Sequence, residues 1–524
     1  MTPVPEARRS RRLWPYPLAC AAVIAAGLTY FLFPQPTPAL PAAAPGEVAA
    51  ANPEQVHAFC GHCHLYPQAD LVPRKHWRHE IRQAYDFFRA SALSLDYPPY
   101  EAVVRYYEER APEELPIARP EAAPADTCPA RFERVAVTGP KEMALTAVSH
   151  VNLVHLFDNR RLDVLTCDME SGWVSAYRPY TSPPSWRPIA KLIAPCHAEV
   201  VDLDGDGIKD LIVADLGSAL PTNGKCGRVV WLRGLPDGTF KPVTLLEGVG
   251  RVADVHAADF NGDGKTDLIV AAFGWTETGE IIHLENQTTD WDHPKFVPHV
   301  VDDRHGTIHV PVVDLDGDGK PDFVALISQE HETIVAFLND GKGNFTRKEL
   351  YTAPHPAYGS SGIQLVDLDG DGDLDILYTN GDVLQDPYLL RPYHGVQWLE
   401  NVGGLRFVHH PLAQLYGAMR AVAADVNGDG RPDILAVNWL PARRFPQREE
   451  LDLDAVILLE QKERGQFVRH VLARRACDSL TCAAGDVFGD GRTHLVTGTF
   501  AFSERGRTDP LIVWKNLGAS WAKP

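Results

Sequence analysis

The chain has 524 residues, 45% of them hydrophobic and 23% charged, which suits two or three soluble globular domains. Its formal net charge of −19 excludes nucleic acid as a partner, because no basic field is available to hold phosphate groups.

The N-terminus carries an export signal. Four arginines between positions 8 and 12 precede an uncharged apolar stretch, residues 13–33, which is long enough to span a bilayer with its basic end in the cytoplasm. Residues 1–34 are therefore predicted to be a signal anchor, and cleavage near the alanines at 42–44 is the alternative. Residues 35–52, rich in proline and alanine, are predicted to be an extended linker.

A short motif, Cys60-Gly-His-Cys63-His64, follows the linker. This spacing is the attachment signal of a c-type haem: both cysteines form thioethers, and the histidine is the proximal iron ligand. The alternatives are a chance match and a redox cysteine pair. Export of the chain and the lack of a surrounding βαβ pattern favour one covalent haem c.

Residues 53–115 are predicted to be mostly helical, with helices over 77–90 and 98–110. The module resembles a mono-haem cytochrome c, and residues 116–130 are predicted to link it to the rest of the chain. No methionine lies within the module, so the sixth iron ligand is expected to be His79. His76, an open sixth position and a ligand from elsewhere in the chain remain alternatives.

Five near-copies of one acidic nine-residue loop occupy the C-terminal part, followed each time by a short apolar run. Oxygen side chains at loop positions 1, 3, 5 and 9, with a carbonyl at position 7, suit a hard cation such as Ca²⁺. An EF-hand would need Glu at position 12, and simple hairpin turns would not need four repeated oxygen ligands. About five Ca²⁺ ions are expected. The predicted ligands are Asp202, Asp204, Asp206, Asp210, Asp259, Asn261, Asp263, Asp267, Asp314, Asp316, Asp318, Asp322, Asp367, Asp369, Asp371, Asp375, Asp425, Asn427, Asp429 and Asp433.

Each loop belongs to a unit with four strand signals, and degenerate copies at Asp163 and at 486–494 bring the number of units to seven. The degenerate copies are expected to bind no metal. The last unit lacks its fourth strand, whereas an unpaired strand pattern starts at Phe132. This spare strand can complete the last unit and close a ring. The predicted fold is thus mainly β, a seven-bladed β-propeller over residues 131–520, with a small N-terminal α-helical cytochrome c-like domain and a transmembrane signal-anchor helix.

The acidic loops resemble the FG-GAP or VCBS repeats of integrin α subunits and of many bacterial exported proteins. The resemblance covers roughly residues 130–520 and implies a calcium-binding propeller.

One residue in each unit, five positions before the loop, is expected to lie on the innermost strand at the end away from the loops. Several of these residues carry chemistry that is unusual for simple packing, and they form a candidate binding or catalytic site on the propeller axis. The alternative is a wet channel lined by polar residues, and metal binding by the histidines is conceivable. The seven positions are His150, His197, Asp254, His309, Gly362, Arg420 and Thr481.

Three functions follow from these features. The first is a redox protein at the periplasmic face of the inner membrane, anchored by residues 13–33 or secreted after cleavage, which passes electrons to a partner protein or oxidises a small molecule. The second is a non-enzymatic, calcium-dependent binding or adhesion module. A hydrolase ranks last, because no catalytic triad or carboxylate pair can be identified in the sequence.

Six further cysteines could form disulfides, but their spacing does not fix the pairing. They are Cys128, Cys167, Cys196, Cys226, Cys477 and Cys482.

Overall fold

The structure is a computed structural model that describes residues 49–62, 64–91, 93–141, 146–384, 388–502 and 509–519. The predicted anchor at 13–33, the alternative cleavage segment at 42–44 and Cys63 lie outside these ranges. Within the described ranges, no helix is long and apolar enough to cross a membrane.

The N-terminal module contains three α-helices: α2 (Pro53–Cys60), α3 (Arg74–Ala90) and α4 (Tyr100–Glu108). The Asn52 side chain caps α2 by accepting the N–H of Glu54 at 2.8 Å. Helix α3 begins three residues before its predicted start, directly after Pro73, and α4 begins directly after Pro99. In both cases a proline with extended backbone is the N-cap, and its carbonyl accepts an N–H of the first turn, from His76 at 2.9 Å and from Ala102 at 3.0 Å.

The module has a small aromatic core of its own. Val56 and Phe59 of α2, Trp77 of α3 and Tyr107 of α4 are buried. The Trp77 and Tyr107 rings stack with their centroids 4.0 Å apart, which ties α3 to α4.

The rest of the described chain forms seven antiparallel sheets, the blades, and a 3₁₀ turn, η1 (Ala125–Thr127), precedes them. The inner strand of blade 4 is split into two because Pro311 interrupts its ladder. A short helix, α5 (Gln447–Glu450), lies in a blade 6 loop. The strands are, in blade 1, β2 (Val148–Val154), β3 (Asp163–Asp168), β4 (Trp173–Arg178) and β5 (Ser185–Lys191); in blade 2, β6 (Pro195–Val201), β7 (Asp210–Asp215), β8 (Gly227–Gly234) and β9 (Phe240–Val249); in blade 3, β10 (Val252–Ala258), β11 (Asp267–Ala272), β12 (Glu280–Asn286) and β13 (Phe296–Asp302); in blade 4, β14 (Thr307–His309), β15 (Val312–Val313), β16 (Asp322–Ile327), β17 (Thr333–Asn339) and β18 (Phe345–Thr352); in blade 5, β19 (Ser360–Val366), β20 (Asp375–Asn380), β21 (Gly395–Asn401) and β22 (Phe407–Gln414); in blade 6, β23 (Ala418–Ala424), β24 (Asp433–Asn438), β25 (Asp454–Glu463) and β26 (Gln466–Arg474); and in blade 7, β27 (Ser479–Gly485), β28 (His494–Thr499), β29 (Leu511–Asn516) and β1 (Phe132–Val137).

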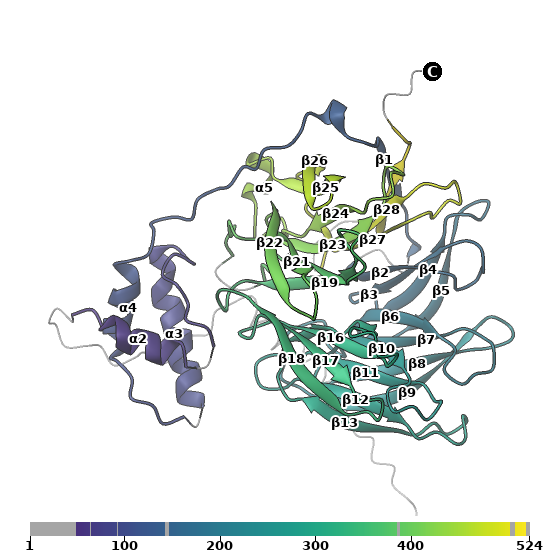
Figure 1. Ribbon diagram of the computed structural model, residues 1–524, viewed down its shortest axis with the longest axis horizontal. Helices are drawn as coiled ribbons and strands as arrows, with labels where there is room; N and C mark the ends of the chain where they lie inside the picture. Colours follow the sequence, from purple (N-terminus) through teal and green to yellow (C-terminus); the bar gives the residue numbers. More distant parts are fainter. Residues whose placement is uncertain are drawn as a thin grey trace, which may run out of the picture. The chain divides into compact units, whose positions relative to one another are not determined.

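The predicted seven-bladed β-propeller is confirmed, including its closure. Strand β1 pairs antiparallel with β29, and Phe132 lies opposite Asn516, so the spare N-terminal strand completes blade 7 (Figure 1). The inner strands contact one another in the order β2, β6, β10, β14, β19, β23, β27 and back to β2, which closes the ring. Closure leaves no inner strand at the end of an open array.

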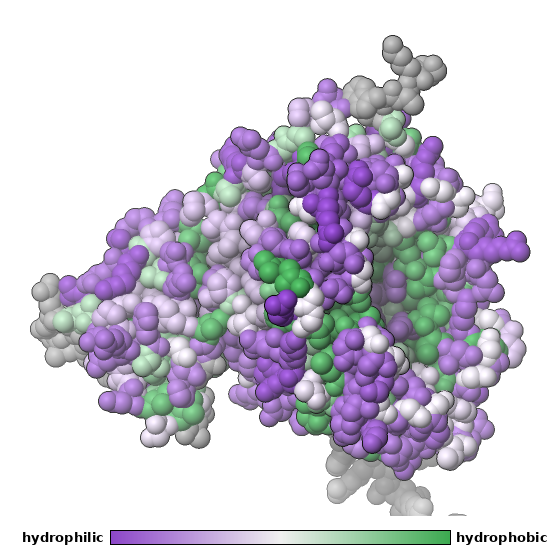
Figure 2. Space-filling view, viewed as in Figure 1, coloured by the Kyte–Doolittle hydropathy of each residue, from purple (hydrophilic) through white to green (hydrophobic). Residues whose placement is uncertain are grey.

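The hydrophobic core lies between the blades. The second strand of each of blades 1 to 6 is buried along its whole length, because the apolar run after each acidic loop faces neighbours on both sides. Seven apolar clusters each join two consecutive blades, as where Trp231 of blade 2 packs in one cluster with Val255 of blade 3. On the face drawn in Figure 2 most surface residues are hydrophilic, and hydrophobic residues gather along a hollow among the blades.

Candidate functional site

The predicted haem attachment site begins at the end of α2. Cys60 is the last residue of that helix, and burial raises the pKa of its thiol to about 11. A redox-active cysteine pair needs a lowered thiol pKa, so this environment disfavours that alternative.

His64 has a defined tautomer. Its Nδ1 lies 2.7 Å from the Leu65 carbonyl oxygen. Because a carbonyl can only accept, Nδ1 carries a proton, and in the neutral imidazole this leaves the lone pair on Nε2. Histidine ligands of metals commonly hold their second nitrogen in this way. His64 and Cys60 therefore fit a covalently attached haem.

The predicted sixth ligand, His79, lies on the exposed side of α3, where its Nε2 is 3.1 Å from Gln83 Nε2. Among the residues that the structure describes, His79 makes no hydrogen bond or ion pair with His64 or Cys60.

The acidic loops hold their carboxylates in a common arrangement. In the blade 4 loop, Asp314 accepts the N–H of Gly317 at 2.9 Å through Oδ1 and that of Gly319 at 2.9 Å through Oδ2. Gly317 and Gly319 adopt φ of +76° and +85°, which only glycine tolerates easily, and this curls the loop around its own side chains. Ligand oxygens of Asp314, Asp316 and Asp322 lie within 4.8 Å of one another. Such clustered carboxylates suit a hard divalent cation.

Position 9 of the loop has a second role that the sequence did not reveal. Asp322 accepts the N–H of Leu315, at loop position 2, at 3.0 Å and the N–H of Asn339, at the end of β17, at 2.7 Å. Equivalent pairs hold Asp210, Asp375 and Asp433. The carboxylate therefore latches the loop to the third strand of its own blade.

The residue at the end of the third strand joins neighbouring blades. Asn339 Nδ2 donates to the Phe260 carbonyl of the preceding loop at 2.9 Å, and Gln461 Nε2 donates to that of Leu368 at 3.0 Å. These contacts explain why an amide side chain recurs at this position.

In the degenerate seventh loop, His494 replaces the latch aspartate. Its Nδ1 accepts the N–H of Asn516 at 3.0 Å, so Nε2 carries the proton and faces Asp490 Oδ1 at 3.0 Å. The imidazole therefore also joins the loop to the third strand. Its Nδ1 accepts from the strand, as the aspartates do, and its Nε2–H donates to Asp490 in the loop.

The axial positions share one local structure. In every inner strand, the predicted residue follows directly after a β-bulge in the pairing with the second strand. A bulge re-aims the next side chain, and its recurrence places the seven residues equivalently. The register on which the prediction relied is therefore correct.

Five of the predicted axial residues form one cluster. The rings of His150 and His197 are 4.4 Å apart, and His197 Nδ1 lies 2.9 Å from Asp254 Oδ1. His309 Nδ1 lies 3.5 Å from Asp254 Oδ2, and Arg420 Nη1 lies 3.5 Å from His309 Nε2.

The other two axial positions, Gly362 and Thr481, carry no charge. A Cβ on Gly362 would lie 3.0 Å from the Met419 carbonyl oxygen and from Thr379 Oγ1, so this position favours glycine. Arg420 donates to the Ile363 carbonyl at 2.9 Å.

Two members of the cluster were not predicted. His256 Nε2 lies 3.5 Å from Asp254 Oδ2, and Glu199 Oε2 lies 3.6 Å from His256 Nδ1. Each follows a predicted residue by two positions on the same strand, Asp254 and His197 respectively. Alternate residues of a strand share a face, so the two-residue spacing from Asp254 and His197 could have predicted His256 and Glu199 as cluster members.

The electrostatics of the cluster centre on Asp254, whose side chain is only 2% exposed. Burial opposes its ionisation, but His197 and His256 outweigh this and hold the pKa of Asp254 well below its usual range. Burial acts against the charged form of His256 too, yet Asp254 raises the pKa of that histidine to about 10. For His150, burial and the nearby His197 hold the pKa well below the usual value. A buried carboxylate is thus surrounded by imidazoles in different protonation states.

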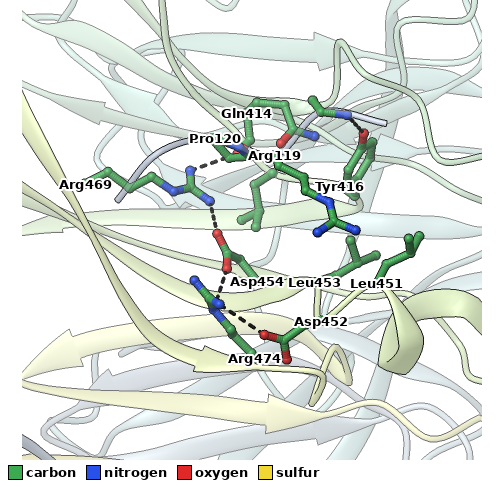
Figure 3. Close-up of a pocket in the computed structure, with 12 residues that line it drawn as sticks. Arg119, Pro120, Gln414, Tyr416, Leu451, Asp452, Leu453, Asp454, Arg469 and Arg474 are labelled. Atoms are coloured by element: carbon green, nitrogen blue, oxygen red, sulfur yellow. Dashed lines mark hydrogen bonds and ion pairs between the residues drawn. The ribbon is translucent and has the colours of Figure 1, made fainter. Parts of the chain in front are cut away.

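A separate cavity lies where the linker crosses blade 6. The Ala118 N–H donates to the Tyr416 hydroxyl at 2.6 Å. Figure 3 shows Arg469 and Arg474 directed at Asp454, at distances of 2.6 Å and 3.2 Å. The cavity lies at the joint between linker and propeller, and these three charged side chains in its lining are paired with one another.

The seven cysteines in the described part of the chain have free thiols there, and no two of them are joined by a disulfide.

Comparison with known proteins agrees with the repeat architecture. Residues 202–270, 314–378 and 379–436 match the FG-GAP-like repeat, so the propeller is built with FG-GAP-like repeats. No curated protein matches the chain. The solved structures similar to it include one titled "Crystal structure of BBS1N in complex with ARL6DN, soaked with lead". It has 11% sequence identity and a TM-score of 0.43, over 74% of this chain and 97% of that chain.

Proposed function

We propose that the protein is a c-type cytochrome in which a helical haem module is joined to a calcium-stabilised propeller, and that it transfers electrons at the cell envelope. The observation that carries this proposal is His64, four residues after Cys60, whose Nδ1–H donates to the Leu65 carbonyl. A bound haem would supply one-electron redox chemistry at its iron. Cys60 and Cys63 would hold the haem covalently, and His64 Nε2 would bind the iron.

His79 is the proposed sixth ligand. Its place on exposed α3 leaves its ring accessible, and the described part of the module holds no methionine to compete with it. Replacement of His79 would leave the haem attached but change its reduction potential, because the axial ligand is one of the main determinants of that potential.

In the propeller, the five acidic loops would bind about five Ca²⁺ ions. The clustered oxygens of Asp314, Asp316 and Asp322 support this assignment. Bound calcium would neutralise each loop, while the position 9 latch transmits the restraint to the blade. The role of the calcium is then structural.

The chain is proposed to lie on the periplasmic face of the inner membrane, held by residues 13–33 or released by cleavage. The propeller would serve as the platform for a redox partner protein or a small molecule. A second candidate function, non-enzymatic binding without electron transfer, is consistent with the FG-GAP-like propeller itself.

The test is a spectroelectrochemical titration of full-length protein matured in a periplasm with c-type haem machinery. A sharp reduced α-band with a reversible one-electron potential is expected, and Cys60→Ala/Cys63→Ala should lack both. His79→Ala should keep the band and shift the potential, whereas a matched change at exposed His293 should not. A colourless wild-type protein would overturn the redox function and favour the binding module.

A further inference from the structure

The axial cluster contains more nitrogen and oxygen donors than a hydrogen-bond network needs. His197 Nδ1 is 2.9 Å from Asp254 Oδ1, yet the two atoms are not aligned for a hydrogen bond. His150 Nε2 is also buried without a hydrogen-bond partner in the part of the chain that the structure describes. A bound ligand would give these buried nitrogens the hydrogen-bond or metal partner that they lack.

The spacing of the donors fits one shared metal ion. Ligand atoms of His197, Asp254 and His256 lie within 4.8 Å of one another. His197 Nδ1 is 2.9 Å from Oδ1 of Asp254, and His256 Nε2 is 3.5 Å from Oδ2 of the same carboxylate. Metal–nitrogen and metal–oxygen bonds of about 2.0–2.2 Å in a tetrahedral site separate the ligand atoms by about 3.3 Å. The observed distances lie close to this value.

The surroundings would orient these ligands. Glu199 Oε2 lies 3.6 Å from His256 Nδ1, on the side of the ring opposite to Asp254, and is itself fixed by the N–H of Ala257 at 2.9 Å. A carboxylate behind a histidine is the usual means of directing its other nitrogen to a metal. Asp254 is held by the N–H groups of Val255 at 3.0 Å and Val310 at 2.9 Å.

We propose that His197, Asp254 and His256 form a binding site for a first-row divalent transition metal such as Zn²⁺ on the propeller axis, with Glu199 as the positioning residue of His256. Imidazole donors select such metals over Ca²⁺, which prefers oxygen. Three protein ligands leave one coordination position open for water or a small anion. Arg420, linked to Asp254 through His309, adds a positive charge to the cluster that would favour an anion on the metal.

The donor set is distinct from the acidic loops and from the haem motif, so the site does not depend on the proposed haem. It also explains why three neighbouring blades, through β6, β10 and β14, direct titratable side chains to one point.

The test counts zinc on the full-length protein in excess Ca²⁺, which keeps the acidic loops filled. Protein is equilibrated with Zn²⁺, separated from free metal and analysed for zinc per chain. His197→Gln and His256→Gln should each bind one equivalent fewer than wild type. His299→Gln is the matched control, because His299 is 52% exposed on β13 and pairs with Glu285 at 2.8 Å outside the axis. Equal zinc content in wild type and both axial variants would overturn the proposal.

Two further measurements make the outcome independent of any folding defect. Zinc-edge X-ray absorption of the wild-type protein should report imidazole scattering at about 2.0–2.1 Å, and a shell made only of oxygen ligands would refute the site. Glu199→Gln should keep the stoichiometry but weaken zinc binding about 10-fold or more. An unchanged affinity would remove Glu199 from its positioning role.

Discussion

Glu332 is a buried carboxyl whose ionisation should control the pH dependence of stability. Glu332 lies in the turn that joins β16 to β17 and is 2% exposed. Its carboxylate accepts the N–H groups of Gly359 at 3.2 Å and of Ser360, the first residue of β19, at 2.9 Å. Burial raises the pKa of Glu332 to about 8 despite these hydrogen bonds, and the charge of Asp382 acts in the same direction. The folded protein therefore holds a proton that the unfolded chain, with an ordinary value of 4.5, releases earlier.

The sign and size of the effect follow from linkage. The stabilisation linked to this proton is fully present below pH 4.5 and is lost as the pH rises through about 8. Integrated from pH 5 to pH 8, the loss is about 3 kcal/mol in the free energy of unfolding. Glu332→Gln cannot ionise, so its stability should lack this contribution.

The assay is denaturant unfolding at pH 5, 6.5 and 8 in fixed excess Ca²⁺. The difference between wild type and Glu332→Gln should change by about 3 kcal/mol across this range. Exposed Glu247 on β9 gives the control, and Glu247→Gln should follow wild type at each pH. Parallel pH profiles for wild type and Glu332→Gln would refute the reasoning.

Three other predictions concern the propeller. Asp322→Ala leaves two backbone N–H groups of the latch unpaired and should lower the free energy of unfolding by about 2–4 kcal/mol in calcium-free buffer. Asp318→Ala changes an exposed residue of the same loop and should lower it by under about 1 kcal/mol. Equal losses for the two variants would contradict the latch. Trp231→Ala empties a fully buried position and should cost about 3–5 kcal/mol, while Trp275→Ala, 38% exposed, should cost far less in the same unfolding assay. Calcium chelation should lower the unfolding temperature reversibly, by an amount equivalent to about 2.7 kcal/mol per site at calcium 100-fold above the dissociation constant; an unfolding temperature independent of calcium would exclude structural Ca²⁺ sites.

The architecture could be predicted because each unit repeats both its loop and its strand pattern. The unpaired pattern at Phe132 even predicted how the ring closes, since a missing strand and a spare strand must complement each other. The axial residues could be found for the same reason: one bulge per inner strand keeps their register equal. His256 and Glu199 were not predicted, because the prediction covered only one residue of each inner strand.

Other features depended on contacts that a pattern cannot distinguish. A carboxylate at loop position 9 serves equally as a metal ligand or as an acceptor for backbone N–H groups, and only the positions of Leu315 and Asn339 identify the second role. Helix starts in the N-terminal module shifted by two to three residues because Pro73 and Pro99 decide them locally. The split of the inner strand in blade 4 likewise follows from Pro311, whose missing N–H interrupts the ladder.

The intact mass of the full-length protein, matured with c-type haem machinery, tests the central claim most directly. The account predicts that wild type exceeds its sequence mass by one covalent haem after denaturation, and that Cys60→Ala/Cys63→Ala does not. A wild-type mass equal to that of the polypeptide alone would contradict the haem attachment on which the proposed electron transfer depends.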